Sequence, residues 1–334
     1  MDQLREIAQA ILHPEKRLQD LIPAAEALRN LFEQRTGFAI DQQAGIDAGG
    51  TRLESGLAIS PPLAAMCIRE LFRTPAFIRG LGHAIKDALQ PDRPVRVLYA
   101  GCGSYAALAL PLMTAFSSEQ VVFTLLDIHG QCLDDAMKLI DLFGLSSHVE
   151  SAQCADATTW RIPADAMPDI IVTETMAVAL HNEPQVSIAR NLCAQAPDAI
   201  MVPQQISVDV CALDVTKEHI FVPSDHVGAI PEPQRDRMFL GRIFSLDAES
   251  IRHWQWIEGD RLPAGQVRIP DVLKKRVLHL MTHIVVYGQT ELKDYDCSLT
   301  MPRPLRGEIG SGDELQFHYQ LGNSPELRYE KREE

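Results

Sequence analysis

The chain of 334 residues lacks the sequence features of secreted, membrane-spanning and nucleic-acid-binding proteins. Its seven cysteines are odd in number and form no Cys-x-x-Cys pair, so we expect neither a disulfide framework nor a zinc site. Lysine and arginine number 31 against 45 aspartates and glutamates, and the net charge of −14 argues against a phosphate-rich partner. No apolar run reaches the roughly eighteen residues of a membrane helix, and no basic segment with an apolar stretch opens the chain. The sequence therefore predicts a cytoplasmic protein that binds no metal, nucleic acid or membrane.

Apolar residues near the start of the chain recur at steps of three and four, which predicts an N-terminal helical segment over residues 1–90. Glycine and proline break this pattern at 36–62, which we interpret as a mobile loop. Its glycine-rich part, 45–56, is either a lid over the site or a plain linker. Ser60, followed by two prolines, predicts the start of the next helix.

The hydrophobic period changes at Val95, where short strand-like runs begin to alternate with helical patterns. The predicted strands are 95–100, 121–126, a short run at 148–152, 170–172 and 199–202, and the predicted helices are about 105–116, 131–143 and 184–196. This alternation predicts an α/β fold with a doubly wound, Rossmann-like parallel sheet over residues 91–203.

After residue 204 the alternation ends, and scattered strand-like runs with frequent proline and glycine predict a β-rich, barrel-like domain over 204–330. These runs are 206–213, 219–222, 237–244, 267–269, 283–287 and 314–319, with a stretch at 272–280 that reads as a helix, a turn or a strand.

The ends of the first three predicted strands carry residues suited to a nucleoside cofactor. Glycines let the backbone turn tightly and approach a ligand, Asp127 at the end of the second strand suits ribose hydroxyls, and Asp156 after the third can accept from the adenine amine. The cofactor candidates here are Gly101, Cys102, Gly103, Ser104, Asp127, Ile128, Asp156 and Ala157. NAD and S-adenosylmethionine are the two candidate cofactors. The third glycine of the dinucleotide fingerprint is missing, which favours a cofactor without pyrophosphate.

The fourth predicted strand enters the run Thr-Glu-Thr-Met-Ala-Val-Ala-Leu-His-Asn-Glu, which places Glu174 and Glu183 nine residues apart. Two carboxylates at this position suit a guanidinium or an amine, which they can hold by charge-assisted hydrogen bonds. Alternatively, both are ordinary surface residues of a loop. His181 in the same run is either a candidate base or a polar surface residue. Met176 is either a wall of the cofactor site or part of the core.

These motifs together resemble the class I S-adenosylmethionine-dependent methyltransferases. The run with the two glutamates resembles the double-Glu loop of protein arginine methyltransferases, in which an apolar strand enters Ser-Glu-x-Met-Gly-x-x-Leu-x-x-Glu. The resemblance extends over about residues 60–330: an Arg-Thr pair at 73–74 is similar to the pair on the helix that covers the cofactor in that family, and Pro203 precedes the barrel. It implies S-adenosylmethionine as cofactor, Glu174 and Glu183 as the groups that hold the substrate nitrogen, and a homodimer. The stretch 225–265 is either the arm through which the chains would dimerise or a packed pair of core strands.

The sequence also departs from that family in three places. Leu-Arg-Gly-Glu-Ile-Gly follows Pro304 where a Thr-His-Trp loop is expected, the Tyr-Phe-x-x-Tyr motif is absent, and Ala177 replaces a glycine. These departures favour a relative that methylates a small nitrogen-containing molecule, such as an amino acid or a guanidine. Three alternatives stay open: a protein arginine methyltransferase, aminocarboxypropyl transfer or cyclisation with the same cofactor, and a non-catalytic binding protein.

Overall fold

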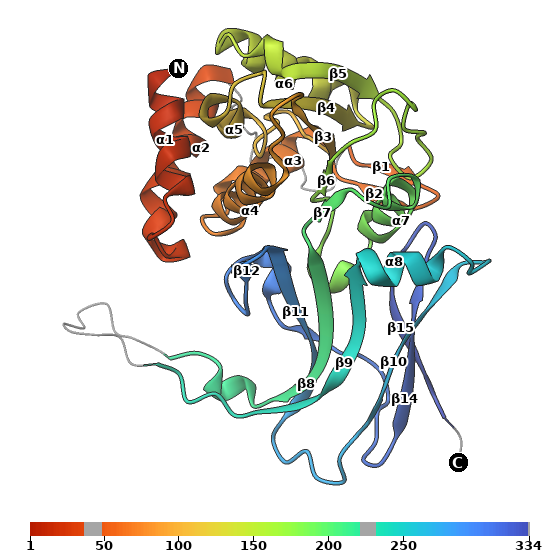
Figure 1. Ribbon diagram of the computed structural model, residues 1–334. Coiled ribbons are helices and arrows are strands. Elements are labelled where there is room, and N and C mark those ends of the chain that lie inside the picture. The colour runs from red at the N-terminus through yellow and green to blue at the C-terminus, as the bar shows by residue number, and fades with distance from the viewer. Residues whose placement is uncertain (37–48, 221–231, 333–334) are drawn as a thin grey trace, which may run out of the picture.

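The computed structural model describes residues 1–36, 49–220 and 232–332, and arranges them as a helix-flanked sheet above a β-rich part (Figure 1). This confirms the predicted fold class: a Rossmann-like parallel sheet, N-terminal helices and a C-terminal antiparallel part. The strand predicted at 219–222 lies partly outside the described residues, and its first two positions are not in a strand. Within the described ranges, no helix is both long and apolar enough to cross a membrane.

The N-terminal helices are α1 (Asp2–Leu12), α2 (Ile22–Thr36), α3 (Pro61–Met66) and α4 (Arg73–Ala88). Of these, α4 contacts the parallel sheet, and α1 and α2 pack outside it against other helices (Figure 1). The start of α3 is set by Ser60, whose side chain accepts a hydrogen bond from the Leu63 N–H. The prediction of a mobile loop at 36–62 is wrong in part. Residues 37–48 lie outside the described residues, but β1 (Thr51–Leu53) and β2 (Gly56–Ala58) pair as an antiparallel hairpin.

The parallel sheet has five strands in the order β5-β4-β3-β6-β7. They are β3 (Val95–Ala100), β4 (Val121–Asp127), β5 (Val149–Cys154), β6 (Ile170–Thr173) and β7 (Ile200–Val202), connected through α5 (Leu110–Ala115), α6 (Gly130–Leu142) and α7 (Gln185–Gln195). The first connecting helix is shorter than predicted because residues 101–109 form turns. In this order, β4 and β5 lie on one side of β3, and β6 and β7 lie on its other side, so the strand order reverses at β3. Ligands of open parallel sheets bind at such a reversal, outside the carboxyl ends of the strands.

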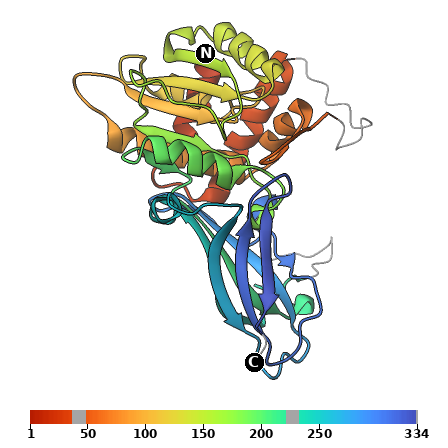
Figure 2. The ribbon, with the colours of Figure 1, turned by 90° about the vertical axis from the view of Figure 1, so that its right-hand side faces the viewer.

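The C-terminal part consists of two antiparallel sheets that face one another below the parallel sheet (Figure 2). One contains β8 (Gln205–Leu213), β9 (Arg237–Asp247), β11 (Val277–Tyr287), β12 (Thr290–Leu292) and β13 (Arg303–Pro304); the other contains β10 (Arg261–Arg268), β14 (Glu314–Gln320) and β15 (Glu326–Lys331). The last residues of the ambiguous stretch at 272–280, from Val277 on, form the start of β11.

The segment predicted as a dimerisation arm, 225–265, has its first residues outside the described ranges and otherwise belongs to the body of the β-rich part. Phe244 of β9 is buried and stacks on Trp254 of α8 (Ala248–Trp254), with ring centres 5.2 Å apart. Phe239 and Trp256 are instead exposed, at 65% and 86%. Residues 214–220, which follow β8 and precede that segment, extend away from the two sheets (Figure 1).

Candidate active site

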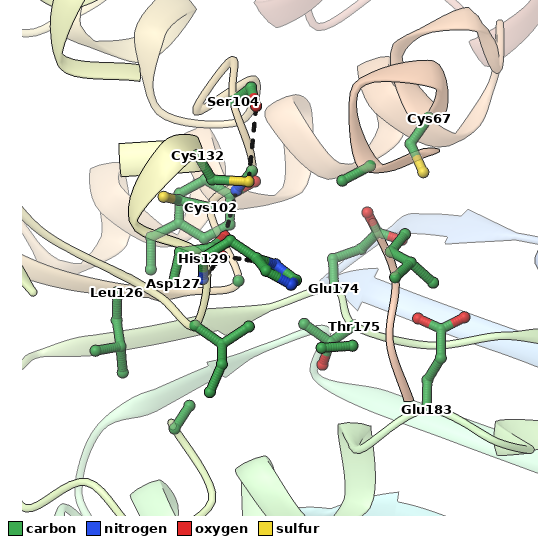
Figure 3. A pocket seen from close by; sticks show the side chains of 18 of the residues that line it. Cys67, Cys102, Ser104, Leu126, Asp127, His129, Cys132, Glu174, Thr175 and Glu183 are labelled. Atoms are coloured by element: carbon green, nitrogen blue, oxygen red, sulfur yellow. Dashed lines mark hydrogen bonds and ion pairs between the residues drawn. The ribbon is translucent and has the colours of Figure 1, made fainter. Parts of the chain in front are cut away.

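A cavity lies at the strand-order reversal and collects residues from the carboxyl ends of β3, β4 and β6, the N-terminal helices and the hairpin (Figure 3). Asp127 and His129 lie at one end of the view, and Glu174 and Glu183 at the other. Because the carboxyl ends of parallel strands meet at one edge, residues more than fifty positions apart in sequence come together here.

The glycine turn after β3 shapes the first end of the cavity. Gly101 has φ +75°, and a Cβ atom added there would lie 2.3 Å from a side-chain carbon of Thr175, so only glycine fits. Gly103, with φ +62°, donates its N–H to Asp127 Oδ2 at 2.9 Å. The other Asp127 oxygen accepts from the His129 N–H at 2.9 Å. These two bonds orient a buried carboxylate that lines the cavity.

The remaining cofactor candidates also line this cavity, but their side chains make different contacts. They are Cys102, Ser104, Ile128, Asp156 and Ala157. Ser104 is fully buried and its hydroxyl points at the Cys132 sulfur. Asp156 Oδ1 accepts from the Thr158 N–H at 2.8 Å and from its hydroxyl at 2.7 Å, so this carboxylate also stabilises a turn. Met176 is buried in the core next to the cavity and does not line it.

Asp127, His129 and Cys132 also bring three metal-binding atom types within 4.8 Å of one another. Both Asp127 oxygens already accept backbone N–H bonds, and His129 Nε2 lies 3.0 Å from the Thr51 hydroxyl of the hairpin. Hydrogen bonds therefore account for the Asp127 carboxylate and for one ring nitrogen of His129.

At the other end of the cavity, Glu174 forms an ion pair with Arg73 of α4. Both side chains are largely buried, 12% and 8% exposed. Burial raises the pKa of Glu174, and Arg73 opposes that rise. The same guanidinium donates to Glu70 at 3.1 Å. Arg73 is the only lysine or arginine among the described residues that line the cavity, so it is the one permanent cation available to a bound ligand.

Glu183 also lines the cavity but is electrostatically different from Glu174. Its side chain has no hydrogen-bond or ion-pair partner within the described part of the chain. Burial raises its pKa to about 7, with Arg73 lowering it and Glu174 raising it further. Near neutral pH this carboxyl group is therefore poised between its protonated and ionised forms.

The loop that joins the two glutamates is held in an unusual conformation. Ala179, Leu180 and Asn182 all have positive φ, which costs free energy for residues other than glycine. The β-rich part holds the loop in place. The Thr282 hydroxyl accepts from the Ala179 N–H at 3.0 Å, the Tyr319 hydroxyl donates to the Leu180 carbonyl at 2.7 Å, and the Pro325 carbonyl accepts from the Asn182 N–H at 2.6 Å. A loop constrained in this way is typical of a functional site.

His181, the predicted alternative base, is not brought into this cavity. Its Nδ1 lies 2.9 Å from the Val178 carbonyl, and its ring lines a separate cavity beside β13 and β15. Burial lowers the pKa of His181, which favours the neutral ring. The reversal of the chain at Asn182 places His181 and Glu183 in different cavities although they are two residues apart.

Sequence reasoning missed three contributors to the site. Arg73 is expected from the resemblance only on a helix over the cofactor, and its ion pair with Glu174 is not predicted. Gln185 is buried and closes the double-Glu loop: its side-chain oxygen accepts from the Thr175 N–H at 2.9 Å, and its nitrogen donates to the Thr173 carbonyl at 3.2 Å. The third missed contributor is the hairpin of β1 and β2. A buried glutamine or arginine leaves no distinct mark in a sequence, because its partners are distant along the chain.

Comparisons with known proteins bear on the fold. The structure is similar to a solved chain described as "Trypanosoma brucei PRMT1 enzyme-prozyme heterotetrameric complex with AdoHcy", with a TM-score of 0.50 and 13% sequence identity. The match covers 80% of this chain and 92% of that chain. No protein-family model matches the sequence, and no curated protein matches it. At this identity the likeness shows a shared fold.

Proposed function

We propose that this protein transfers a methyl group from S-adenosylmethionine to a small nitrogen-containing molecule that Glu174 and Glu183 hold. The observation that carries the proposal is Glu183, a partly buried carboxylate without a partner among the described residues, in the same cavity as the glycine turn and Asp127. Leaving such a group buried costs free energy, and a cationic ligand would offset that cost.

The residues at the glycine end fit S-adenosylmethionine. Asp127 would accept hydrogen bonds from ribose hydroxyls, and Arg73 would hold the carboxylate of the methionine moiety. The solved chain of similar fold was determined with AdoHcy, which supports a cofactor of this type. When bound, S-adenosylmethionine would supply an electrophilic methyl group, and Gly101 and Gly103 let the backbone itself line the cofactor cavity.

The two glutamates would have different roles in the reaction. Glu174 is paired with Arg73, whereas Glu183 has no cationic partner among the described residues and is therefore free to face a substrate cation. Glu183 would bind the substrate N–H and accept the proton that the nitrogen loses on methylation. Its pKa of about 7 matches that task, because a base works best when its pKa is close to the working pH.

The hairpin supports a small substrate over a protein. Its Leu57 N–H donates to the Asn182 carbonyl at 2.7 Å, and its Arg52 donates to the Asn182 side chain at 3.0 Å and to the Asn323 carbonyl at 2.9 Å. A Cβ at Gly56 would lie 2.9 Å from the Asn182 carbonyl oxygen, so hairpin and loop are in close contact. A polypeptide approaching Glu183 from this side would have to displace the hairpin.

We also propose that the protein is a homodimer. The similar solved chain belongs to a heterotetrameric complex, and Phe239 and Trp256 expose large apolar surfaces here. Light scattering of the purified protein tests this, and a strictly monomeric mass at micromolar concentration would contradict it.

The test of the proposed function begins with calorimetric titration of S-adenosylmethionine and S-adenosylhomocysteine into the wild type and Asp127→Ala. We expect binding by the wild type and a large loss in the variant. Mass spectrometry of reactions with amino acids, guanidines and an arginine-containing peptide then identifies the acceptor, with Glu174→Gln as the inactive control.

The product mass separates methyl transfer from the two alternative reactions of the cofactor. A mass increase by an aminocarboxypropyl group, or cofactor cyclisation without an acceptor, would contradict methyl transfer. Methylation of the peptide alone would contradict the small substrate. Absence of cofactor binding would favour a non-catalytic binding protein.

A further inference from the structure

Asn182, the residue directly before Glu183, lies at the centre of a tight turn. Its φ is +67°, and the Glu183 N–H donates to the His181 carbonyl at 2.8 Å. A three-residue turn with a positive φ at its centre is rare and strained. Such a conformation persists only where the surrounding contacts hold it. The direction in which the Glu183 side chain leaves the loop therefore depends on the groups that bind Asn182.

The backbone N–H, the backbone carbonyl and the side-chain oxygen of Asn182 are all hydrogen-bonded. The N–H donates to the Pro325 carbonyl, in the connection between β14 and β15, at 2.6 Å. The carbonyl accepts from the Leu57 N–H of the hairpin at 2.7 Å, and the side-chain oxygen accepts from Arg52 at 3.0 Å. The same Arg52 guanidinium donates to the Asn323 carbonyl at 2.9 Å. Asn182 is thus clamped between the hairpin and the β14–β15 connection, and Arg52 ties these two elements together.

Gly56, at the start of β2, brings the hairpin into direct contact with this turn. Its φ is +138°, and a Cβ atom added there would lie 2.9 Å from the Asn182 carbonyl oxygen and 3.2 Å from the Glu183 carbonyl carbon. Any other residue at this position would therefore push the hairpin away from the loop. Leu53 and Leu57 of the hairpin also line the cavity that contains Glu183. The hairpin thus holds the turn and forms part of the wall around the carboxyl group.

The titratable groups that face Glu183 from the other elements around it are, among the described residues, Arg73, Glu174 and Cys67. Burial raises the pKa of Glu183 to about 7, Arg73 opposes that rise, and Glu174 adds to it. The Cys67 thiol also feels the charge of Glu183, and burial raises the pKa of that thiol to about 11. None of these three groups belongs to the hairpin. A change in the hairpin would therefore act on Glu183 through its burial.

We propose that Arg52 and Asn182 are positioning residues for Glu183, and that the hairpin, docked through Gly56, keeps this carboxylate directed into the cavity. The inference rests on the proposed function, in which Glu183 is the base. It gives the hairpin a part in the reaction, because the base is held and shielded from water only while the hairpin is docked at Asn182. When the hairpin leaves, the strained turn relaxes and water reaches the carboxyl group.

The test measures the pKa of Glu183 in the folded, ligand-free protein by NMR, from the pH dependence of the carboxyl signals of isotope-labelled glutamate. The signal that is lost in Glu183→Gln identifies the residue. In the wild type we expect a pKa of about 7. In Gly56→Ala and in Arg52→Ala we expect it to fall by roughly 1 or more towards the ordinary value of 4.5, because the carboxyl group becomes hydrated.

Gly49→Ala is the matched control. Gly49 also has a positive φ, +97°, beside the hairpin, but a Cβ atom added there would meet only the Ser60 side chain, at 3.5 Å. This variant should leave the pKa of Glu183 at about 7. If Gly56→Ala does not fold, Arg52→Ala still decides the question, because the Arg52 side chain is exposed.

An unchanged pKa of Glu183 in Gly56→Ala and Arg52→Ala would make the hairpin a purely structural element and overturn the proposal. A rise in Arg52→Ala would also overturn it, because loss of a nearby cation raises the pKa of a carboxyl group and the guanidinium would then act through its charge. An equal fall in Gly49→Ala would overturn the contact at Gly56 as the cause. Calorimetric titration of S-adenosylhomocysteine keeps the two proposals apart: a wild type that does not bind it overturns the proposed function, whereas the pKa of Glu183 tests the positioning without any ligand.

Discussion

Replacing Glu183 by glutamine should stabilise the ligand-free protein above pH 7 while it removes the proposed activity. The folded protein holds the pKa of this carboxyl group at about 7, against an ordinary value of 4.5. As pH rises from 4.5 to 7, the unfolded chain releases the proton and the folded protein retains it, so the free energy of unfolding falls in that window. Above pH 7 the group is ionised in both states, so the loss in the free energy of unfolding no longer changes with pH. Two and a half pKa units correspond to about 3 kcal/mol, an upper limit because the side chain is only partly buried.

Glutamine has the shape of the carboxyl group without its ionisation, so the variant escapes this penalty. Thermal unfolding at pH 5 and pH 8 measures the effect. We expect little difference from the wild type at pH 5 and a higher midpoint for Glu183→Gln at pH 8, by several degrees at roughly 2 °C per kcal/mol. Glu119→Gln, at an exposed site, should leave the midpoint unchanged at both pH values. A gain that is equal at pH 5 and pH 8, or a loss at pH 8, would refute the reasoning.

Four further predictions concern the site. The kcat/KM of the proposed reaction should rise with pH through an apparent pKa near 7, as Glu183 loses its proton; a flat profile between pH 6 and 8 would exclude it as the base. Gly101→Ala should abolish cofactor binding in a calorimetric titration, because its Cβ would lie 2.3 Å from a threonine methyl group, whereas Gly288→Ala, also at positive φ but with open space around it, should retain binding. Gln185→Leu should lower the free energy of unfolding by about 1–3 kcal/mol and reduce kcat, because it leaves the partly buried Thr175 N–H without its acceptor; unchanged kcat would make the residue purely structural. Arg73→Met should destabilise the protein by about 3–5 kcal/mol near neutral pH, because it leaves a buried carboxylate unpaired, and should weaken cofactor binding; equal cofactor affinity would remove the residue from the proposed site.

Local sequence patterns determined the secondary structure of the parallel sheet closely. The strand predicted at 95–100 is β3, and the strand predicted at 121–126 is β4 with Asp127 added. Buried parallel strands are short apolar runs, and their period differs from that of the flanking helices, so the pattern needs no long-range information. The hairpin at 51–58 was missed because its strands have three residues each, too few for a period to be visible.

The sequence by itself also placed the glycine turn and Asp127 in one site, because strand ends of a doubly wound sheet converge on one edge whatever their side chains. Only the tertiary structure decided how the charges of that site are distributed. Arg73 pairs with Glu174 and not with Glu183, which leaves one carboxylate with a pKa of about 7. The conformation of the loop at Asn182 puts His181 into a separate cavity that no motif indicates. Charge pairing and burial depend on contacts between residues far apart in the chain, and a pattern of neighbours along the sequence does not contain them.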